Sequence, residues 1–433
     1  MRKELPKMER AYNCKTTFAR NPEGILFWCG QNLDELSKIC GTPSLIYDER
    51  QIKNNVLWYN EIIENINFSG IVSAALKATG HISIVKTLRL VGAFCEVMTE
   101  EEFLLAVEAG YEASQIIVNG LGWSDGLLEL ICTHQPYMVN VDNIEDGYKL
   151  NKIALKESVT IPISFRIVPQ IEQKFATSTE KLGTIVNQDF FDEITKLEKM
   201  SNLDLVGFSV HALHRCADIN EISRVVESIV VMCSKAINRG LNIKYINIGG
   251  GLDFRSNLEN TDVTPKNIAK IINENFANFP KDITVIFEPG RFLIGDAAIM
   301  LTQVRVRKQR KGKDWIIVDA GTNILIPLPT AQFKVHEIHS NGLACTLFDI
   351  GDGICSPTSV IAQDCSLSEQ LEQGDFLAIS NVGAYALALG ENWGYEFPTV
   401  SIIDENGKLF NTLSRAEARR NFFRAWGVNR DFS

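Results

Sequence analysis

The chain has 433 residues, a formal net charge of -10 at pH 7, 45% hydrophobic residues and 22% charged residues. This composition is typical of a soluble globular protein, and the length exceeds what one core usually supports, so we expect two domains. The acidic balance argues against a nucleic-acid partner, and no apolar stretch reaches the roughly 18 residues of a membrane span, which argues against a membrane partner.

The N-terminal segment lacks the apolar core of a signal peptide, so we expect a cytoplasmic protein. Ten cysteines without a CxxC pair indicate reduced thiols in that compartment, and six histidines without HExxH spacing predict no structural metal. Residues 1–45 hold too little to fold alone, and their last run, SLIYD, is strand-like. We therefore expect this segment to join a β domain formed by the C-terminal part of the chain.

From about residue 70 to 290, short apolar runs alternate with amphipathic stretches of helical spacing, most clearly at 99–110 and 219–240. Strands that each precede a helix imply a parallel sheet, and eight of them close a (β/α)8 barrel, which we place at residues 46–295. The eight runs are GIVSAAL (70–76), AFCEV (93–97), QIIVN (115–119), YMVNV (137–141), IPISFRI (161–167), LVGFSVH (205–211), KYINI (244–248) and ITVIF (283–287).

After the barrel, strand-like runs separated by Gly, Asp and Asn turns predict an all-β domain at 296–433, resembling a β-barrel or sandwich. The basic run RVRKQRKGK (305–313) lies between two such runs, and we interpret it as a solvated hairpin rather than a binding patch. The runs are IMLTQVRVRKQ (299–309), DWIIVDAG (314–321), ACTLFDIG (344–351), DFLAISNVG (375–383) and PTVSIIDENGKLFNTL (398–413).

Distinctive residues follow four of the predicted barrel strands. Lys77 in SAALKATG closes the first strand, His211 closes the sixth, GGG (249–251) follows the seventh and EPGR (288–291) follows the eighth. Such strand ends meet at one face of a barrel, where its active site lies, so we expect the four elements to converge. Lys77 alone is more often a surface lysine, and the barrel context carries this prediction.

Together these residues indicate a phosphorylated aromatic cofactor. GGG allows backbone amides to approach a phosphate, although it could equally be a tight turn, and Arg291 supplies a charge-assisted donor. A desolvated lysine such as Lys77 has a lowered pKa and can form an imine, and Glu288 can keep a pyridine nitrogen protonated. These features describe pyridoxal phosphate.

From CGTPSLIYDER to NVGAYALALGENW the chain resembles the fold-type III pyridoxal-phosphate-dependent decarboxylases, which include diaminopimelate, ornithine and arginine decarboxylases. By this resemblance, Lys77 in ALKAT carries the cofactor, His211 in FSVHALH stacks on its ring and Glu288 pairs with its nitrogen. Arg166 and Asn323, the latter in the diaminopimelate-like VDAGTN, are weaker candidates for substrate contacts. The phosphate ligands that the resemblance implies are Gly249, Gly250, Gly251, Gly290, Arg291 and Tyr385.

Cys355 in DGIC matches a family cysteine that reaches into the active site of the partner subunit. The resemblance implies that it returns a proton to the former α-carbon after decarboxylation. It also implies a homodimer with shared active sites.

The chain departs from the family at three places. His214 stands where the family has a serine that meets the phosphate, so it either takes the phosphate or points elsewhere. ILIPLPTAQF (324–333) lacks the arginine and tyrosine that hold the substrate of diaminopimelate enzymes, and Ser356 replaces the glutamate that receives its distal ammonium. A buried ammonium without a partner is costly, which disfavours diaminopimelate, ornithine and lysine as substrates.

The tripeptide at 355–357, Cys-Ser-Pro, is similar to the Cys-Thr-Pro of family members that act on amino acids joined to a citryl group or a carrier protein, as in siderophore biosynthesis. We therefore expect a decarboxylase of such a conjugate, with meso-diaminopimelate decarboxylase of lysine biosynthesis as the alternative. A catalytically silent regulatory homologue would have no use for Lys77, Glu288 and Cys355. A racemase would need a tyrosine at the Cys355 position, which is not evident.

Overall fold

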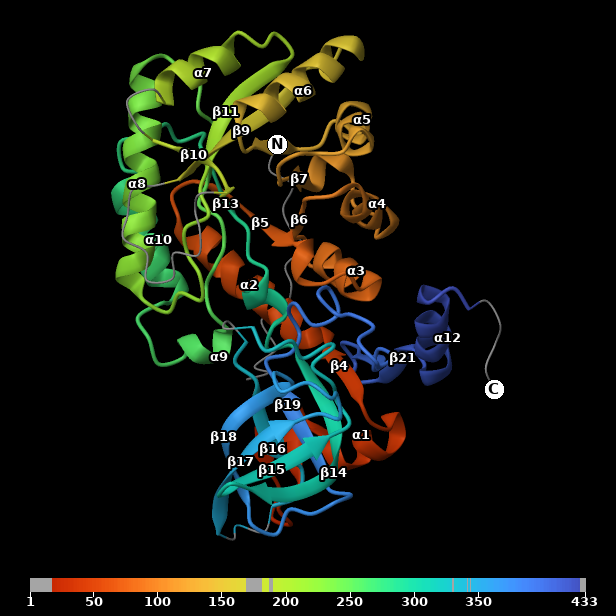
Figure 1. The fold of residues 1–433 in the computed structure, drawn as a ribbon. Coiled ribbons are helices and arrows are strands. Elements are labelled where there is room, and N and C mark those ends of the chain that lie inside the picture. The colour runs from red at the N-terminus through yellow and green to blue at the C-terminus, as the bar shows by residue number, and fades with distance from the viewer. Residues whose placement is uncertain are drawn as a thin grey trace.

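The computed structural model describes residues 18–168, 181–186, 190–328, 331–340, 342 and 344–428. The first 17 residues of the expected N-terminal segment and two residues of ILIPLPTAQF, 329 and 330, lie outside the described residues. Figure 1 shows a parallel barrel surrounded by helices in its upper part and a β domain in its lower part. The predicted combination of a (β/α)8 barrel and a β domain is confirmed.

The barrel consists of parallel strands that close through the β13–β5 and β8–β9 pairs. Each of the eight predicted apolar runs overlaps one of these strands, and β10 (Thr184–Ile185) adds a short pair to the side of β9. The barrel strands are β5 (Ser69–Ala75), β6 (Phe94–Val97), β7 (Ile116–Val118), β8 (Met138–Val141), β9 (Ile161–Val168), β11 (Leu203–Ser209), β12 (Tyr245–Asn247) and β13 (Thr284–Phe287).

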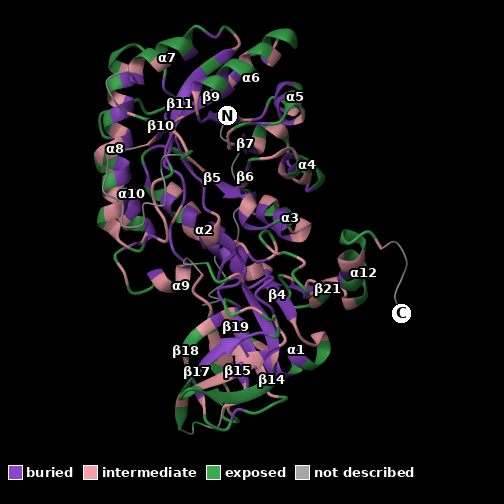
Figure 2. Ribbon diagram, viewed as in Figure 1, coloured by how far each residue is buried: buried purple, intermediate pink, exposed green. Residues whose placement is uncertain are grey.

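The helices around the barrel bury one face each, as the purple inner faces in Figure 2 show. Thr99 caps the helix predicted within 99–110 by accepting a hydrogen bond from the backbone N–H of Glu102 (3.2 Å), and Gly110 follows its end with φ +88°. The helices and single turns are α2 (Glu49–Asn65), η1 (Leu76–Ala78), α3 (Ile82–Leu90), α4 (Glu100–Glu108), η2 (Ala113–Gln115), α5 (Asp125–His134), α6 (Ile144–Lys156), α7 (Phe190–Glu198), α8 (Ile219–Asn238), α9 (Arg255–Leu258), α10 (Pro265–Asn275) and α11 (Arg291–Ile294).

The β domain is built around the long strand β14, which pairs with β15, β19 and β4. The basic run lies in the exposed β14–β15 hairpin, as predicted, because Lys311 and Gly312 adopt φ of +50° and +78° and form its two-residue turn. The strands are β4 (Ser44–Asp48), β14 (Ala298–Arg310), β15 (Lys313–Val318), β16 (Lys334–Glu337), β17 (Cys345–Gly351), β18 (Val360–Ser368), β19 (Phe376–Ser380), β20 (Thr399–Ile403) and β21 (Leu409–Leu413).

The N-terminal segment contributes to the β domain through β4, which lies between β14 and β20. Before it come β1 (Phe18–Arg20), β2 (Leu26–Trp28), β3 (Gln31–Asn32) and α1 (Leu33–Cys40), and the N–H of Leu26 donates to the carbonyl oxygen of Ile338 (2.8 Å). Since β4 extends to Asp48, the domain limits at residues 45 and 295 remain a proposal. At the other end, α12 (Arg415–Ala425) lies at the side of the molecule (Figure 1).

Residues of both parts pack into one hydrophobic cluster, which runs from Tyr59 and Val285 of the barrel to Ile379 and Val400 of the β domain. This shared core holds the loops of the β domain against the barrel. Among the described residues, no helix has both the length and the apolar character needed to cross a membrane.

Candidate active site

Lys77 lies just beyond the first barrel strand, on the single turn η1. Strand pairing stops at Ala75, whose N–H donates to the carbonyl oxygen of Pro289 (3.1 Å), and the N–H of Thr79 closes the turn on Leu76 (2.8 Å). The prediction that Lys77 closes the strand itself is therefore off by two residues. Its Nζ lies 3.3 and 3.4 Å from the two carboxylate oxygens of the buried Glu96.

The charge environment of Lys77 also differs from the expectation. Burial acts to lower the pKa of the amine, but its interactions with Glu96, Tyr385 and Glu288 outweigh burial and raise this pKa above its ordinary value. The prediction that the pKa of Lys77 is lowered is thus wrong for the protein without its cofactor. Lys77 is an ammonium group that must lose a proton before it can act as a nucleophile, and Glu96 is the adjacent carboxylate.

Glu288 follows β13 and is buried at the centre of the barrel mouth. Among the described side chains, three asparagines donate to its carboxylate: Asn247 (2.8 Å) and Asn140 (3.2 Å) to Oε1, and Asn119 (3.1 Å) to Oε2. Burial and then the Glu96 charge raise the pKa of Glu288, whereas Asn247, Lys77 and Asn119 act to lower it. The amides therefore support an ionised carboxylate in a site that opposes ionisation.

The glycine loop packs too closely against neighbouring backbone to hold any side chain. A Cβ on Gly249 would lie 2.3 Å from the carbonyl oxygen of Val210, and one on Gly250 would lie 2.1 Å from that of Glu288. On Gly251 it would lie 2.0 Å from the carbonyl oxygen of Leu213, and Gly251 has φ +103°. Only glycine meets these conditions, so the three residues form a bare-backbone cradle beside Glu288.

His211 lies two residues beyond β11 and is exposed at the barrel mouth. Its Nδ1 accepts a hydrogen bond from the N–H of Gly250 (3.4 Å), which leaves this nitrogen without a proton. Desolvation by surrounding protein atoms, and then the charges of Lys77, Arg166 and His214, lower the pKa of His211 to about 3. The ring is therefore neutral at physiological pH.

His214 lies beside the cationic end of the same cradle. Burial lowers its pKa, and the charges of Arg291 and Arg215 lower it further. A neutral imidazole next to Arg291 can donate a hydrogen bond to an anion without adding to the positive charge.

Tyr385 of the β domain closes the mouth over Arg291 and the Lys77 turn. Its N–H donates to the carbonyl oxygen of Ala78 (2.9 Å), and the Arg291 guanidinium carbon lies 5.0 Å from the centre of its ring. Tyr385 has φ +63°, a conformation that a non-glycine residue holds only under constraint. A Cβ on Gly290 would lie 3.1 Å from the Ala78 Cβ and 3.4 Å from the Tyr385 hydroxyl, so Gly290 lies between the Lys77 turn and this ring.

Three predicted site residues, Cys355, Ser356 and Asn323, stand apart from this cluster, whereas Arg166 lies close to it. Cys355 is exposed and Ser356 half-buried in the loop between β17 and β18, and the Ser356 hydroxyl pairs with that of Thr358 (2.9 Å). The amide of Asn323 donates to the carbonyl oxygen of Glu391 (3.2 Å). Arg166, on β9, lies 3.9 Å from the Asp142 carboxylate and close enough to His211 to affect its pKa.

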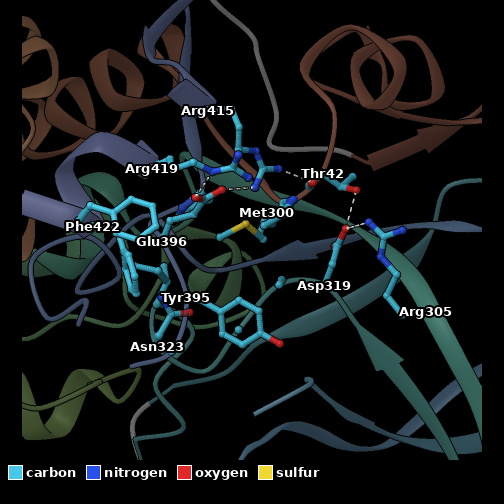
Figure 3. A pocket seen from close by; sticks show the side chains of 17 residues that line it. Thr42, Met300, Arg305, Asp319, Asn323, Tyr395, Glu396, Arg415, Arg419 and Phe422 are labelled. Atoms are coloured by element: carbon cyan, nitrogen blue, oxygen red, sulfur yellow. Dashed lines mark hydrogen bonds and ion pairs between the residues drawn. The ribbon is translucent and has the colours of Figure 1, made fainter. Parts of the chain in front are cut away.

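A cavity of about 420 Å³ opens between the β domain and α12, and Asn323 lines it while Lys77 and Glu288 do not (Figure 3). Its charged groups pair with each other, as Arg305 does with Asp319 (2.7 Å) and Arg415 with Glu396 (2.9 Å). We therefore place the chemistry at the barrel mouth, where unlike groups converge around Glu288, and not in this cavity.

The groups that surround Glu288 and Lys77 were not among the predicted site residues. Asn119, Asn140 and Asn247 lie at or near the ends of the predicted runs QIIVN, YMVNV and KYINI, and Glu96 lies inside AFCEV. A polar residue near the end of an otherwise apolar barrel strand was the available signal.

The donors at the mouth fit pyridoxal phosphate. Lys77 offers an amine, Glu288 a buried carboxylate for a ring nitrogen, and the glycine cradle with Arg291 offers donors for a phosphate.

Comparison with known proteins agrees with this chemistry. Residues 52–295, more than half of the chain, match the model of the pyridoxal-binding domain of pyridoxal-dependent decarboxylases. The chain is 29% identical to a diaminopimelate decarboxylase of Aquifex aeolicus over 89% of this chain and 92% of the relative. It is 24% identical to a diaminopimelate decarboxylase of Pseudomonas fluorescens over 90% of this chain and 94% of the relative.

Two solved structures show the same fold over nearly the whole chain. AQ1208 from Aquifex aeolicus has a TM-score of 0.84 at 26% identity and covers 94% of this chain and 98% of its own. Diaminopimelate decarboxylase from M. jannaschii, in complex with L-lysine, has a TM-score of 0.85 at 23% identity and covers 94% and 98%. The chain therefore belongs to the fold-type III pyridoxal-dependent decarboxylases and is a pyridoxal-phosphate-dependent carboxy-lyase.

Proposed function

We propose that this decarboxylase removes a carboxylate from meso-diaminopimelate. The observation that carries the proposal is the similarity to diaminopimelate decarboxylases over 89% of the chain, in a protein that gathers Lys77, Glu288 and the glycine cradle at one barrel mouth. These findings favour the amino acid itself over the conjugate that the tripeptide at 355–357 suggested.

Lys77 holds the cofactor aldehyde, and Glu96 takes up the proton that the amine must first lose, since its oxygens lie 3.3 and 3.4 Å away. When bound, pyridoxal phosphate supplies an electron-accepting ring for the electron pair left by departing carbon dioxide. Glu288 keeps the ring nitrogen protonated, which requires that the carboxylate be ionised. His211 is a neutral ring at the same mouth and would pack against the bound cofactor.

The glycine cradle, residues 249–251, would hold the cofactor phosphate together with Gly290, Arg291 and Tyr385. Arg291 contributes the positive charge, and Tyr385 orders its guanidinium from the β domain. We assign His214 to the same phosphate, because the ring lies near Arg291 and its lowered pKa leaves it neutral at physiological pH. His214 then replaces the serine of the family motif.

Cys355 supplies a proton to the active site of a partner subunit, so the enzyme works as a homodimer. Cys355 is exposed at the tip of a loop whose base is held by Asp352. This carboxylate accepts hydrogen bonds from the Thr322 hydroxyl (2.9 Å) and the Ser359 hydroxyl (2.6 Å). A reactive group that is firmly held yet exposed is suited to complete a site on another subunit.

A second candidate substrate is an amino-acid conjugate with a neutral distal end. It is favoured by Ser356, whose hydroxyl cannot neutralise a distal ammonium, and by the apolar residues Ile324, Ile326 and Leu328, which line a recess beside Arg291 and Tyr385.

Release of carbon dioxide from meso-diaminopimelate, lysine, ornithine, arginine and citryl-linked amino acids tests the two candidates. Diaminopimelate should give the highest kcat/KM, and turnover of only the citryl conjugates would contradict the proposal. Ser356→Glu should raise kcat/KM for diaminopimelate by roughly tenfold if this position faces the distal ammonium. Ser366→Glu, an exposed serine of β18 outside this loop, is the matched control and should leave it unchanged.

A further inference from the structure

The side chain of Asn247 hydrogen-bonds to both Glu288 and the glycine cradle. Its Nδ2 donates to Glu288 Oε1 at 2.8 Å, and its Oδ1 accepts from the N–H of Gly249 at 2.9 Å. The side chain is fully buried, so no water competes for either bond. Its two arms therefore connect the carboxylate and the cradle through a single amide group.

The backbone fixes the position of this amide on both sides. Asn247 belongs to β12, where it pairs with Ser209 of β11 and Ile286 of β13, and its carbonyl oxygen accepts from the N–H of Val210 (2.9 Å). Since both neighbouring strands lead directly to His211 and Glu288, a shift of the amide would move the two ends of the site together. A buried group held in this way has little freedom to turn away from its partners.

The charges around Glu288 explain why a neutral amide is suited to this place. Glu96, on β6, repels the Glu288 carboxylate, and Lys77, on η1, attracts it. When Lys77 holds the cofactor, its ammonium charge is no longer available to stabilise the Glu288 carboxylate. The Asn247 amide does not titrate, so it remains a hydrogen-bond donor to Glu288 at every pH. Asn247 supplies the shortest of the amide hydrogen bonds to this carboxylate.

We infer that Asn247 is a positioning residue that couples the carboxylate facing the cofactor ring nitrogen to the glycine cradle facing the cofactor phosphate. This inference rests on the proposed role of Glu288. Asn140 offers a matched comparison, because it donates to the same oxygen, Glu288 Oε1, at 3.2 Å but makes no bond to the cradle.

The test uses the holoenzyme loaded with pyridoxal phosphate labelled with 15N in its ring. Asn247→Leu and Asn140→Leu should each move the 15N signal toward the unprotonated form at neutral pH, because a weaker donor set lets Glu288 keep the proton. Each should lower kcat by roughly 10- to 100-fold, the range expected for one hydrogen bond to a charged group. Only Asn247→Leu should also weaken the binding of pyridoxal phosphate, by roughly tenfold, since it alone leaves the Gly249 N–H without its acceptor.

Asn247→Asp provides a variant of nearly unchanged shape, should the leucine variant fail to fold. It keeps an acceptor for Gly249, so cofactor affinity should stay within about threefold of wild type, but it sets a further carboxylate beside Glu288, in addition to Glu96. The pH profiles of the 15N signal and of kcat should therefore differ from those of the wild type. A wild-type pH profile in this variant, or equal cofactor affinities in the two leucine variants, would overturn the inference.

Glu288→Gln separates this inference from the proposed function. If Glu288→Gln leaves the 15N signal protonated, Glu288 is not the partner of the ring nitrogen, and the proposed role of Glu288 fails. If Glu288→Gln moves the signal and both Asn247 variants leave it in place, only the role of Asn247 fails.

Discussion

The barrel mouth and the Cys355 loop, residues 352–359, use buried polar groups for opposite purposes. At the mouth, Glu96 and Glu288 are buried close together, and their mutual repulsion is offset by Lys77 and by asparagine amides. In the loop, the buried carboxylate of Asp352 accepts hydrogen bonds from backbone and hydroxyl donors and anchors the base, while the tip remains exposed. The mouth thus keeps two mutually repelling carboxylates that the chemistry needs. In the loop, the hydrogen-bonded carboxylate of Asp352 makes the backbone rigid.

The largest effect is expected at the mouth. Lys77→Ala should lower carbon dioxide release by at least about a thousandfold, because it removes the group that holds the cofactor. The dialysed variant should also lose the visible absorbance of bound cofactor. Lys86→Ala, an exposed lysine on α3, is the control and should keep both. A Lys77→Ala enzyme with wild-type turnover would contradict the assignment of the site to this mouth.

The next effect concerns the tip of the loop. Cys355→Ala should keep cofactor absorbance but lower turnover by roughly a hundredfold, as expected for loss of a proton donor. Cys345→Ala, also an exposed cysteine of the β domain, should keep turnover.

Mixing the two inactive proteins sharpens this comparison. If the loop serves the partner subunit, random reassociation of Lys77→Ala with Cys355→Ala should restore about a quarter of wild-type activity, because each mixed dimer regains one intact site. No recovery despite exchange of subunits would mean that each chain completes its own site.

A smaller effect is expected at the base of the loop. Asp352→Ala should lower the free energy of unfolding of the β domain by roughly 2–4 kcal/mol, because it leaves the buried hydroxyls of Thr322 and Ser359 without their acceptor. Urea unfolding followed by tryptophan fluorescence measures the change. Glu372→Ala, an exposed acid of the same domain, should change the midpoint little.

The smallest effect is expected from the ionisation of Glu102, a carboxyl group near the mouth. Burial, and further the charge of Glu96, raise the pKa of Glu102 from 4.5 to about 7, although the Met98 N–H opposes this. Between about pH 4.5 and pH 7, Glu102 is therefore protonated in the folded state but ionised in the unfolded state. The free energy of unfolding falls as the pH rises through this range.

Glu102→Gln should remove this pH-dependent loss of stability, because glutamine does not ionise. At about pH 8 its thermal midpoint should lie above that of the wild type, by the equivalent of roughly 1–2 kcal/mol, and at about pH 4 the two should coincide. Glu108→Gln, an exposed acid on the same helix α4, should follow the wild type at both values. A Glu102→Gln variant that is no more stable at the higher pH would show that the mouth carries no such cost.

The strands and the positions at their ends were predictable from local patterns. Each apolar run is continuous because a parallel barrel strand is covered on both faces, and so the runs located Lys77, His211, the GGG loop and Glu288. The motifs then indicated the cofactor. The substrate was less predictable, since it depends on the tripeptide at 355–357 and on a loop that the fold alone does not orient.

The protonation of Lys77 and the surroundings of Glu288 could not be predicted in the same way. The apolar residues around Lys77 in the sequence predicted burial and so a lowered pKa. Glu96, 19 residues away in the sequence, lies 3.3 Å from Lys77 in space and contributes most to raising this pKa instead. Similarly, Asn247 is 41 residues from Glu288 and Asn119 is 169 residues away. Electrostatic interactions depend on distance in space, which hydrophobic periodicity does not report.

The sequence by itself determined the barrel, the β domain and the group of residues that can hold pyridoxal phosphate, because these follow from periodicity and from residue types at strand ends. Only the tertiary structure decided that Lys77 is charged, that Asn247 links Glu288 to the glycine cradle, and that Tyr385 closes the mouth from the other domain. The physical reason is that closing the barrel brings side chains from distant strands into hydrogen-bonding contact in a buried site, where each charge is governed by its neighbours.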